Sequence, residues 1–462
     1  MAETDTIPPE EDGIHDKEDR LLPEYVKQVI EAVEAGDDAR ARDLVEPLHP
    51  ADVADLIEVV SQETRARLIT ALGHEVDAEV YAEMNDYVRE VVIEEMDPAV
   101  AAELTGEMDT DDAVAVLEDL DDDDQRAILD AMEPDDRAAV EEALTFPEES
   151  AGRLMQRDLI AVPEHWHVGQ VIDYLRSDED LTSDFWEIFV VGPQHRPVGT
   201  TKLSTLLRTP RAVPITDIMQ EEQTLIPVDM DQEEVALKFQ KYGLISAAVV
   251  DENGRLVGMI TVDDIVHIVQ EEAGEDTLLL AGAGEGDINE SIAEAYSERV
   301  RWLIANLGTA LIATFVIAMF EGTIAELAIL AALMPIVAAL GGNAGTQSLA
   351  VTVRALATNQ LTGANRWRTV GREFQVAMLN GITIAVILGI GVSIFLYPAM
   401  GAVIAAAILF NILIAGMAGV LVPVALDRFG ADPAVASSVF VTTVTDTMGF
   451  FAFLGLASAV LL

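Results

Sequence analysis

The sequence predicts a multidomain membrane protein with an α-helical N-terminal solenoid, an α/β region that repeats one unit, a connecting helix and an all-α transmembrane domain. Three observations support this fold class: a twelve-residue apolar repeat, two successive strand–helix–hairpin segments, and five apolar stretches of membrane length. We expect a disordered tail at 1–20 and the solenoid at 21–149. The two α/β copies should occupy 150–211 and 212–270, followed by the connecting helix at 271–298 and the membrane domain at 299–462.

The charge is distributed very unevenly along the 462 residues, which carry 27 Lys and Arg against 81 Asp and Glu, a net charge of −54. Residues 299–462 hold 7 basic and 6 acidic residues, which leaves 20 basic and 75 acidic residues in 1–298. Such acidity excludes nucleic-acid binding, which needs a basic surface. It fits divalent-cation binding and, equally, a halophilic acidic surface in a salt-adapted host. We favour the host explanation for most of the charge, so acidity alone does not identify metal sites.

Several classes of site and signal are absent from the chain. There is no cysteine, which excludes disulfides and thiolate metal sites. Residues 1–19 are polar and acidic without an apolar core, so they are not expected to be a signal peptide. No phosphate-binding glycine loop of the Walker type occurs, which argues against ATP-driven pumping. We expect a protein that is not an enzyme.

Residues 21–146 have a helical pattern with a period of twelve. Acidic residues or Thr stand at the turns between the apolar runs, where they cap helix N-termini. Stacked helix–turn units of this kind form an α-solenoid. The apolar positions are Leu48, Val60, Leu72, Met84, Met96, Met108, Leu120, Met132 and Leu144.

Residues 150–272 contain two copies of a mixed α/β unit. In the second copy we expect a helix at 231–242 and strands at 247–251 and 256–260. The Asn253-Gly254 pair between the strands is a hairpin signal. Thr261 then caps the last helix. The two copies together resemble a tandem pair of CBS domains.

The five expected membrane spans are 301–320, 324–353, 374–398, 402–426 and 434–462. Basic residues flank the first span and fill the connection between the second and third. The positive-inside rule therefore places the soluble domains in the cytoplasm and the C-terminus outside a multi-pass cell (plasma or inner) membrane. These basic residues are Arg299, Arg301, Arg354, Arg366, Arg368 and Arg372.

Asp446 is the only charged residue of the last span. A carboxylate at mid-membrane costs about 2.5–3.5 kcal/mol, so such residues normally face a pore, an ion path or a partner. Asp446 therefore predicts a cation pathway. The alternative is a residue buried between helices whose carboxylate bonds Thr443 or Thr447.

The second span contains three glycines in five residues, Gly341, Gly342 and Gly345, after Pro335. We expect an irregular backbone here whose freed carbonyls face an ion, with Asn343 and Gln347 adding polar side chains. The alternative is close helix packing through small residues.

Two membrane segments carry a resemblance to a known family. Pro335 with 341–348 and 354–357 closely resembles the second membrane helix of MgtE-type magnesium transporters, and 432–434 with 441–446 resembles their fifth. The order of domains is similar along nearly the whole chain. The resemblance implies a homodimer in membrane lipid, with a Mg²⁺ pore on the two-fold axis that holds the hydrated ion. The implied pore residues are Asp446, Gly341, Gly342, Asn343, Gly345 and Thr442.

The resemblance also implies regulation, because the family's connecting helix plugs the pore when Mg²⁺ bridges it to the cytosolic domains. Asp121 and Asp124, within an acidic run, are expected partners in the N-domain, as are Asp111 and Asp112. Two positions depart from the family, where Gly243 and His267 replace aspartates. The alternative is a solvated charged face. The matching positions are Asp231, Glu233, Asp264, Glu272, Glu275 and Asp276.

CBS pairs also bind adenine nucleotides such as ATP, and Thr261 with Asp264 matches their Thr-x-x-Asp pattern, whereas Ser204 replaces the acid in the first copy. A purely structural pair is the alternative. For the whole protein, two alternatives to a Mg²⁺ channel remain: a nucleotide-regulated transporter of another divalent cation (Co²⁺, Mn²⁺ or Zn²⁺), and a membrane-anchored metal sensor without conduction.

Overall fold

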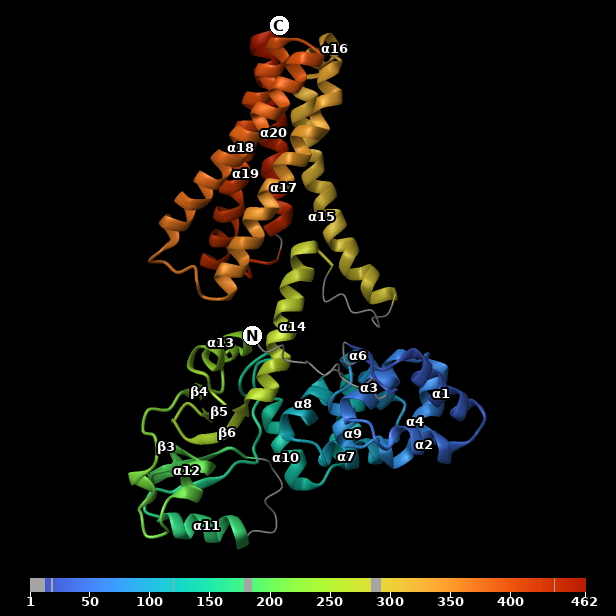
Figure 1. Cartoon of the computed structure of the whole chain (residues 1–462), viewed down its shortest axis with the longest axis vertical. Helices are drawn as coiled ribbons and strands as arrows, with labels where there is room; N and C mark the ends of the chain where they lie inside the picture. The colour runs from blue at the N-terminus through green and yellow to red at the C-terminus, as the bar shows by residue number, and fades with distance from the viewer. Residues whose placement is uncertain (1–12, 18–19, 119, 178–184, 284–291, 436) are drawn as a thin grey trace, which may run out of the picture. The chain divides into compact units, whose positions relative to one another are not determined.

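The computed structural model describes residues 13–17, 20–118, 120–177, 185–283, 292–435 and 437–462 (Figure 1). The chain forms two compact units, Met1–Val269 and Gln270–Leu462. Most of the expected tail, 1–20, lies outside the described residues.

The first unit begins with a stack of short helices around one continuous apolar core, as the apolar repeat predicted. The last four helices start twelve residues apart, at residues 98, 110, 122 and 134. Asp97 and Asp121 cap two of them, because each carboxylate accepts a hydrogen bond from a backbone N–H of its helix's first turn, 3.0 and 3.1 Å away. The ten helices are α1 Pro23–Glu34, α2 Asp38–Val45, α3 Pro50–Val59, α4 Gln62–Leu72, α5 Ala78–Ala82, α6 Asp86–Glu94, α7 Pro98–Gly106, α8 Thr110–Glu118, α9 Asp122–Ala131 and α10 Pro134–Ala143.

The α/β part consists of two three-stranded sheets with the same topology, a parallel pair followed by an antiparallel pair. The entry segment of each copy pairs with the sheet of the other copy, since Gln156 bridges to Met259 and Gln220 bridges to Thr200. This exchange joins the copies as a pair. The elements are β1 Ala161–Pro163, α11 Val168–Ser177, β2 Glu187–Val191, β3 Pro197–Lys202 and α12 Leu203–Arg208, then β4 Leu225–Pro227, α13 Gln232–Tyr242, β5 Ser246–Val250 and β6 Leu256–Thr261.

Helix α14, Val262–Ala281, runs without interruption through the expected boundary at 270. The last helix of the second copy and the start of the connecting segment are thus one helix. Residues 284–291 of that segment lie outside the described part of the chain.

The second unit confirms the five predicted spans, since five of its described helices are long and apolar enough to cross a membrane. Helix α19 packs against α17, α18 and α20 and is the most buried of them, while α15 packs mainly on α20 (Figure 1). A short helix, α16 (Glu321–Glu326), precedes α17. The long helices are α15 Ile292–Met319, α17 Ile329–Ala357, α18 Arg366–Phe395, α19 Pro398–Arg428 and α20 Ser437–Leu461.

Candidate ion pathway and acidic sites

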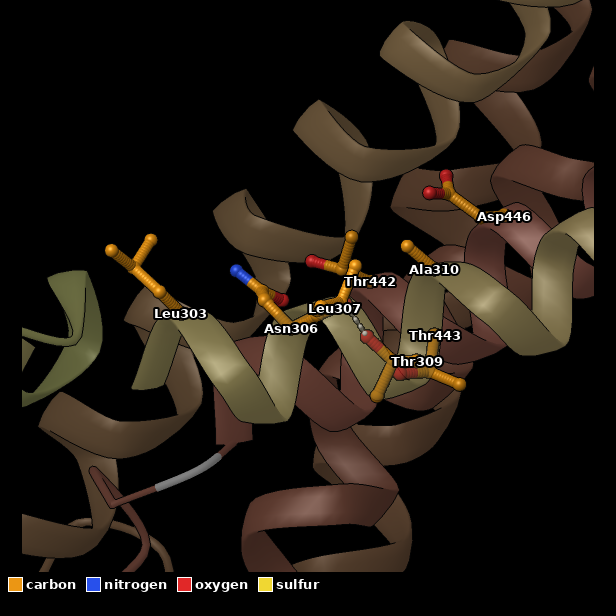
Figure 2. Close-up of a pocket in the computed structure, with 8 residues that line it drawn as sticks. All are labelled: Leu303, Asn306, Leu307, Thr309, Ala310, Thr442, Thr443 and Asp446. Atoms are coloured by element: carbon orange, nitrogen blue, oxygen red, sulfur yellow. Dashed lines mark hydrogen bonds between the residues drawn. The ribbon is translucent and has the colours of Figure 1, made fainter. Parts of the chain in front are cut away.

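A pocket of about 380 Å³ lies between α15 and α20, beside Asp446 (Figure 2). Its polar lining consists of hydroxyls, one amide and one carboxylate, which are oxygen ligands suited to a hard cation. The lining residues are Leu303, Asn306, Leu307, Thr309 and Ala310 of α15 and Thr442, Thr443 and Asp446 of α20.

The threonines near Asp446 do not account for its carboxylate. The Thr443 hydroxyl donates to the carbonyl oxygen of Val439, 2.6 Å away, and the buried Thr447 hydroxyl has no hydrogen-bond partner. The explanation of Asp446 as a residue bonded to Thr443 or Thr447 is therefore wrong. Its carboxylate stands instead in the wall of a pocket that both polar and apolar side chains line (Figure 2).

The expected irregular backbone at 341–348 is wrong, because α17 is helical throughout this stretch. The glycines provide close packing. A Cβ on Gly341 would stand 2.2 Å from the amide nitrogen of Asn411 in α19, and one on Gly345 would stand 2.6 Å from Val441 in α20. Since the helix keeps its own hydrogen bonds, its carbonyls are not freed toward an ion.

Of the six implied pore residues, two line the pocket beside Asp446 and four do not. Thr442 and Asp446 line the pocket together. Its described lining does not include Gly341, Gly342, Asn343 or Gly345. It does include Asn306 and Thr309, polar residues of the first span that our sequence reasoning did not select; their spacing on one helical face was the available signal.

A group of carboxylates in the first unit forms a second candidate site. Asp109, Asp111 and Asp112, at the start of α8, have carboxylate oxygens within 4.8 Å of one another. Asp111 is 9% exposed, and its buried Oδ1 has no hydrogen-bond partner. A buried carboxylate oxygen without a donor is costly unless a cation or proton compensates it.

The charges of this group act on one another and on Asp264 of α14. Burial and then the charges of Asp264 and Asp112 raise the pKa of Asp111 well above its usual range. Burial and then Asp264 and Asp109 raise the pKa of Asp112 to about 6. The pKa of Asp264 is also raised to about 6, mainly by burial. Four carboxylates thus concentrate negative charge where a divalent cation would be stabilised.

Thr261 and Asp264 form the N-terminal cap of α14. The Thr261 hydroxyl donates to Asp264 Oδ2 over 2.7 Å, and the Thr261 backbone N–H also points to this oxygen. The helix begins directly after Thr261, as predicted, and the Thr261 hydroxyl is a donor to Asp264. The same pattern that suggested a nucleotide site thus has a structural role, and Asp264 interacts electrostatically with the carboxylates of α8.

A pair of acidic residues in the second unit, Asp276 and Asp432, forms a third candidate site. Burial and then the charge of Asp432 raise the pKa of Asp276, in the second half of α14. Asp432 also accepts a hydrogen bond from the Ala434 N–H, 2.7 Å away. Leu279 and Leu280, one turn after Asp276, pack against the apolar cluster around Leu349 and Val441. Our sequence reasoning did not select Asp432 as a ligand, although it lies in the family-like segment 432–434.

The other implied regulatory residues have varied roles. Asp231 caps α13, accepting the Glu233 N–H over 3.0 Å, and Asp121 caps α9. The Asp124 backbone N–H donates to the Asp121 carboxylate, within the first turn of α9. Gly243 ends α13 in the left-handed conformation, φ 62°, which glycine adopts without strain. Glu233, Glu272 and Glu275 each have a polar or electrostatic partner, and His267 lies in α14.

Comparison with known proteins identifies three family domains in the chain. The MgtE family, described as a divalent cation transporter, matches residues 334–456. The MgtE intracellular N domain matches residues 48–149, and the CBS domain matches residues 215–271. Together they follow the order of parts predicted from the sequence.

Curated relatives match over two thirds of their length. Magnesium transporter MgtE of Bacillus subtilis is 32% identical over 320 residues, covering 68% of this chain and 70% of the relative. The MgtE proteins of Enterococcus faecalis and Thermus thermophilus are each 31% identical, and 70% and 71% of them is covered.

Two solved structures are similar to about half of the chain. The soluble part of a magnesium transporter is 25% identical, with a TM-score of 0.49, and covers 54% of this chain and 98% of its own. The cytosolic domain of the Mg²⁺ channel MgtE in complex with ATP is 29% identical, with a TM-score of 0.49. The match covers 53% of this chain and 99% of that structure's chain. From its family domains and its curated relatives, this chain belongs to the MgtE family of magnesium transporters.

Proposed function

We propose that the protein is a homodimeric Mg²⁺ channel in which Asp446 holds the hydrated ion. The observation that carries this proposal is the pocket of about 380 Å³ with a carboxylate in its wall and only oxygen-bearing polar groups around it. Mg²⁺ loses water reluctantly, so outer-shell contacts to a carboxylate and hydroxyls suit it better than a tight cage. The α15 wall is largely uncovered, which fits a second subunit closing the pathway.

The proposed orientation places the soluble unit in the cytoplasm and the C-terminus outside, as the arginines at 354, 366, 368 and 372 favour. A cysteine placed at the chain's C-terminus tests it, since the protein has no other. Labelling of intact cells by an impermeant maleimide supports the orientation, and labelling only after lysis contradicts it.

We propose that cytosolic Mg²⁺ closes this channel by binding between carboxylates. At low Mg²⁺ the group Asp109, Asp111, Asp112 and Asp264 is repulsive, and so is the pair Asp276 and Asp432. Binding of Mg²⁺ neutralises both repulsions and favours the closed arrangement. The test is channel activity in proteoliposomes as Mg²⁺ on the side of the soluble unit is raised. Activity that is independent of this Mg²⁺ contradicts the gating.

Two alternatives differ from this proposal in measurable ways. A transporter of Co²⁺, Mn²⁺ or Zn²⁺ predicts faster uptake of the softer ion in the same liposomes, but the all-oxygen pocket favours Mg²⁺. A membrane-anchored sensor predicts no flux of any ion. Binding of ATP at the CBS pair, through Thr261 and Asp264, predicts a nucleotide affinity that Asp264→Asn lowers. Isothermal titration with ATP measures it.

A further inference from the structure

A second pocket, of about 190 Å³, lies in the membrane unit between α17, α18 and α19. None of its lining residues belongs to the pocket beside Asp446, which α15 and α20 line. Its polar lining residues are Gln347 and Ser348 of α17 and Arg372, Glu373 and Asn380 of α18.

Glu373 is a buried carboxylate in α18, one of the five helices long and apolar enough to cross a membrane, with 6% of its surface exposed. The Ser348 hydroxyl donates to its Oε2 over 3.2 Å. The nearest guanidinium nitrogen of Arg372 is 3.9 Å from Oε1, which is too far for a hydrogen bond, and the Arg372 side chain is 71% exposed. An ionised carboxylate offers about four acceptor positions, so one hydroxyl leaves most of its capacity for water or a cation.

The wall that holds Ser348 is closely packed. A Cβ on Gly419 of α19 would stand 2.7 Å from the Ser348 Cβ, and one on Gly416 would stand 2.7 Å from Ala377 of α18. The three helices therefore touch through small residues on both sides of Ser348. The close packing around Ser348 and its hydrogen bond to Glu373 place the hydroxyl and the carboxylate side by side in the pocket wall.

Glu373 and Asp446 each lie in the first half of their helix, α18 and α20. Both α18 and α20 start at the end of the bundle where α17 ends (Figure 1). Glu373 and Asp446 are seven and nine residues from the starts of these helices, or about 10 and 14 Å at 1.5 Å per residue. Gly345 packs on Val441 of α20, whereas Ser348 faces Glu373.

We infer that the Glu373 pocket is a second binding site for a hydrated divalent cation. The site offers a carboxylate, a hydroxyl and two side-chain amides, all with oxygen ligands. Its volume corresponds to about six waters at ~30 Å³ each, enough for a cation that keeps much of its hydration shell. Arg372 is a tethered cation that competes for the same carboxylate. The inference rests on the proposed conduction of Mg²⁺, because its role is to concentrate the ion beside the pathway.

The test is the single-channel Mg²⁺ current in planar bilayers, measured as Mg²⁺ is varied on the side of the soluble unit. The unitary current is independent of how often the gate opens, so it separates this site from the gating sites. Glu373→Gln keeps the acceptor for Ser348 but removes the charge, and we expect the half-saturating Mg²⁺ concentration to rise about tenfold, as for a lost charge-assisted contact. Arg372→Gln removes the competing cation, and we expect this concentration to fall.

Opposite shifts in the two variants distinguish a cation site from a structural ion pair. Arg368→Gln is the matched control, since Arg368 is exposed one turn earlier on α18 and does not line the pocket, and it should leave half-saturation unchanged. A half-saturating Mg²⁺ concentration that is unchanged in Arg372→Gln overturns the inference, even if Glu373→Gln does not fold. A half-saturating Mg²⁺ concentration in Glu373→Gln that equals the wild-type value also overturns it. Absence of current in the wild type instead overturns the proposed channel function.

Discussion

At the scale of residues, Asn411 explains the glycines that first suggested an open backbone. It is 1% exposed in α19, its amide donates to the Val337 carbonyl oxygen over 3.0 Å, and both Gly341 and Gly449 lie against it. The sequence indicated the glycines but not their partner, because Asn411 lies in a different helix and nothing local links them. Close packing was an open alternative and is the one the structure supports.

This packing predicts that Gly341→Ala destabilises the membrane unit. The new methyl group would stand 2.2 Å from the Asn411 amide nitrogen, and overpacking of this kind costs about 1–3 kcal/mol. Gly342→Ala is the matched control, because nothing lies within 4 Å of its Cβ position. Thermal midpoints in detergent measure both variants, and Asn411→Ala should partly restore Gly341→Ala. Equal midpoints for the two glycine variants would show that the Asn411 contact is unimportant.

At the scale of elements, the acidic start of α8 makes the stability of the first unit depend on pH. The pKa values of Asp112 and Asp264 are raised to about 6, so the folded state binds protons more tightly than the unfolded state. The resulting stability is complete below the unfolded pKa, near 4, and is lost as the pH rises through about 6. Protonation and Mg²⁺ binding therefore compensate the same repulsion.

We expect the urea concentration at the unfolding midpoint of the first unit, without Mg²⁺, to decrease as the pH is raised from 5 to 7. Added Mg²⁺ should restore it at pH 7 and have less effect at pH 5, where protons occupy the carboxylates. Circular dichroism of the full-length protein at constant salt measures this transition. Asp112→Asn should flatten the pH dependence; a midpoint that instead rises with pH in the absence of Mg²⁺ contradicts the assignment.

The pair Asp276 and Asp432 predicts a specific change in gating. Asp276→Asn removes one carboxylate of the pair, so closure should require about tenfold more cytosolic Mg²⁺, as expected for one lost charge-assisted ligand. Asp427→Asn is the control, since Asp427 is exposed at the C-terminal end of α19, shortly before Asp432 in the chain. Open probability against Mg²⁺ is the measurement. The gating proposal loses its second site if both variants close at the wild-type concentration.

The sequence alone predicted the elements of this fold better than it predicted the acidic sites. The twelve-residue repeat, the Asn253-Gly254 hairpin and the apolar spans each follow from local pattern, and the structure confirms them. The acidic sites were harder to predict, because carboxylates occur throughout residues 1–298 and only burial separates Asp111 from the exposed capping residue Asp121. Burial depends on tertiary contacts that no local pattern records.

At the scale of the whole molecule, a strongly acidic first part of the chain is followed by residues 299–462, whose 7 basic and 6 acidic residues nearly cancel. Helix α15 has only 6% of its apolar window buried, although it forms one wall of the pocket beside Asp446. A pathway with one wall so exposed is incomplete without lipid or a second copy. We expect light scattering in detergent to give a protein mass of twice 49.8 kDa. A monomeric mass with full Mg²⁺ flux would contradict the homodimer.

The most direct test of the central claim is Mg²⁺ flux into proteoliposomes by the wild type and by Asp446→Asn. The amide keeps the size of the side chain but removes the charge that should hold the hydrated ion, so flux should fall about tenfold or more. Glu326→Gln, at an exposed carboxylate of the membrane unit, is the matched control and should conduct normally. Flux that survives Asp446→Asn at the wild-type rate would contradict the assignment of Asp446 to the pore.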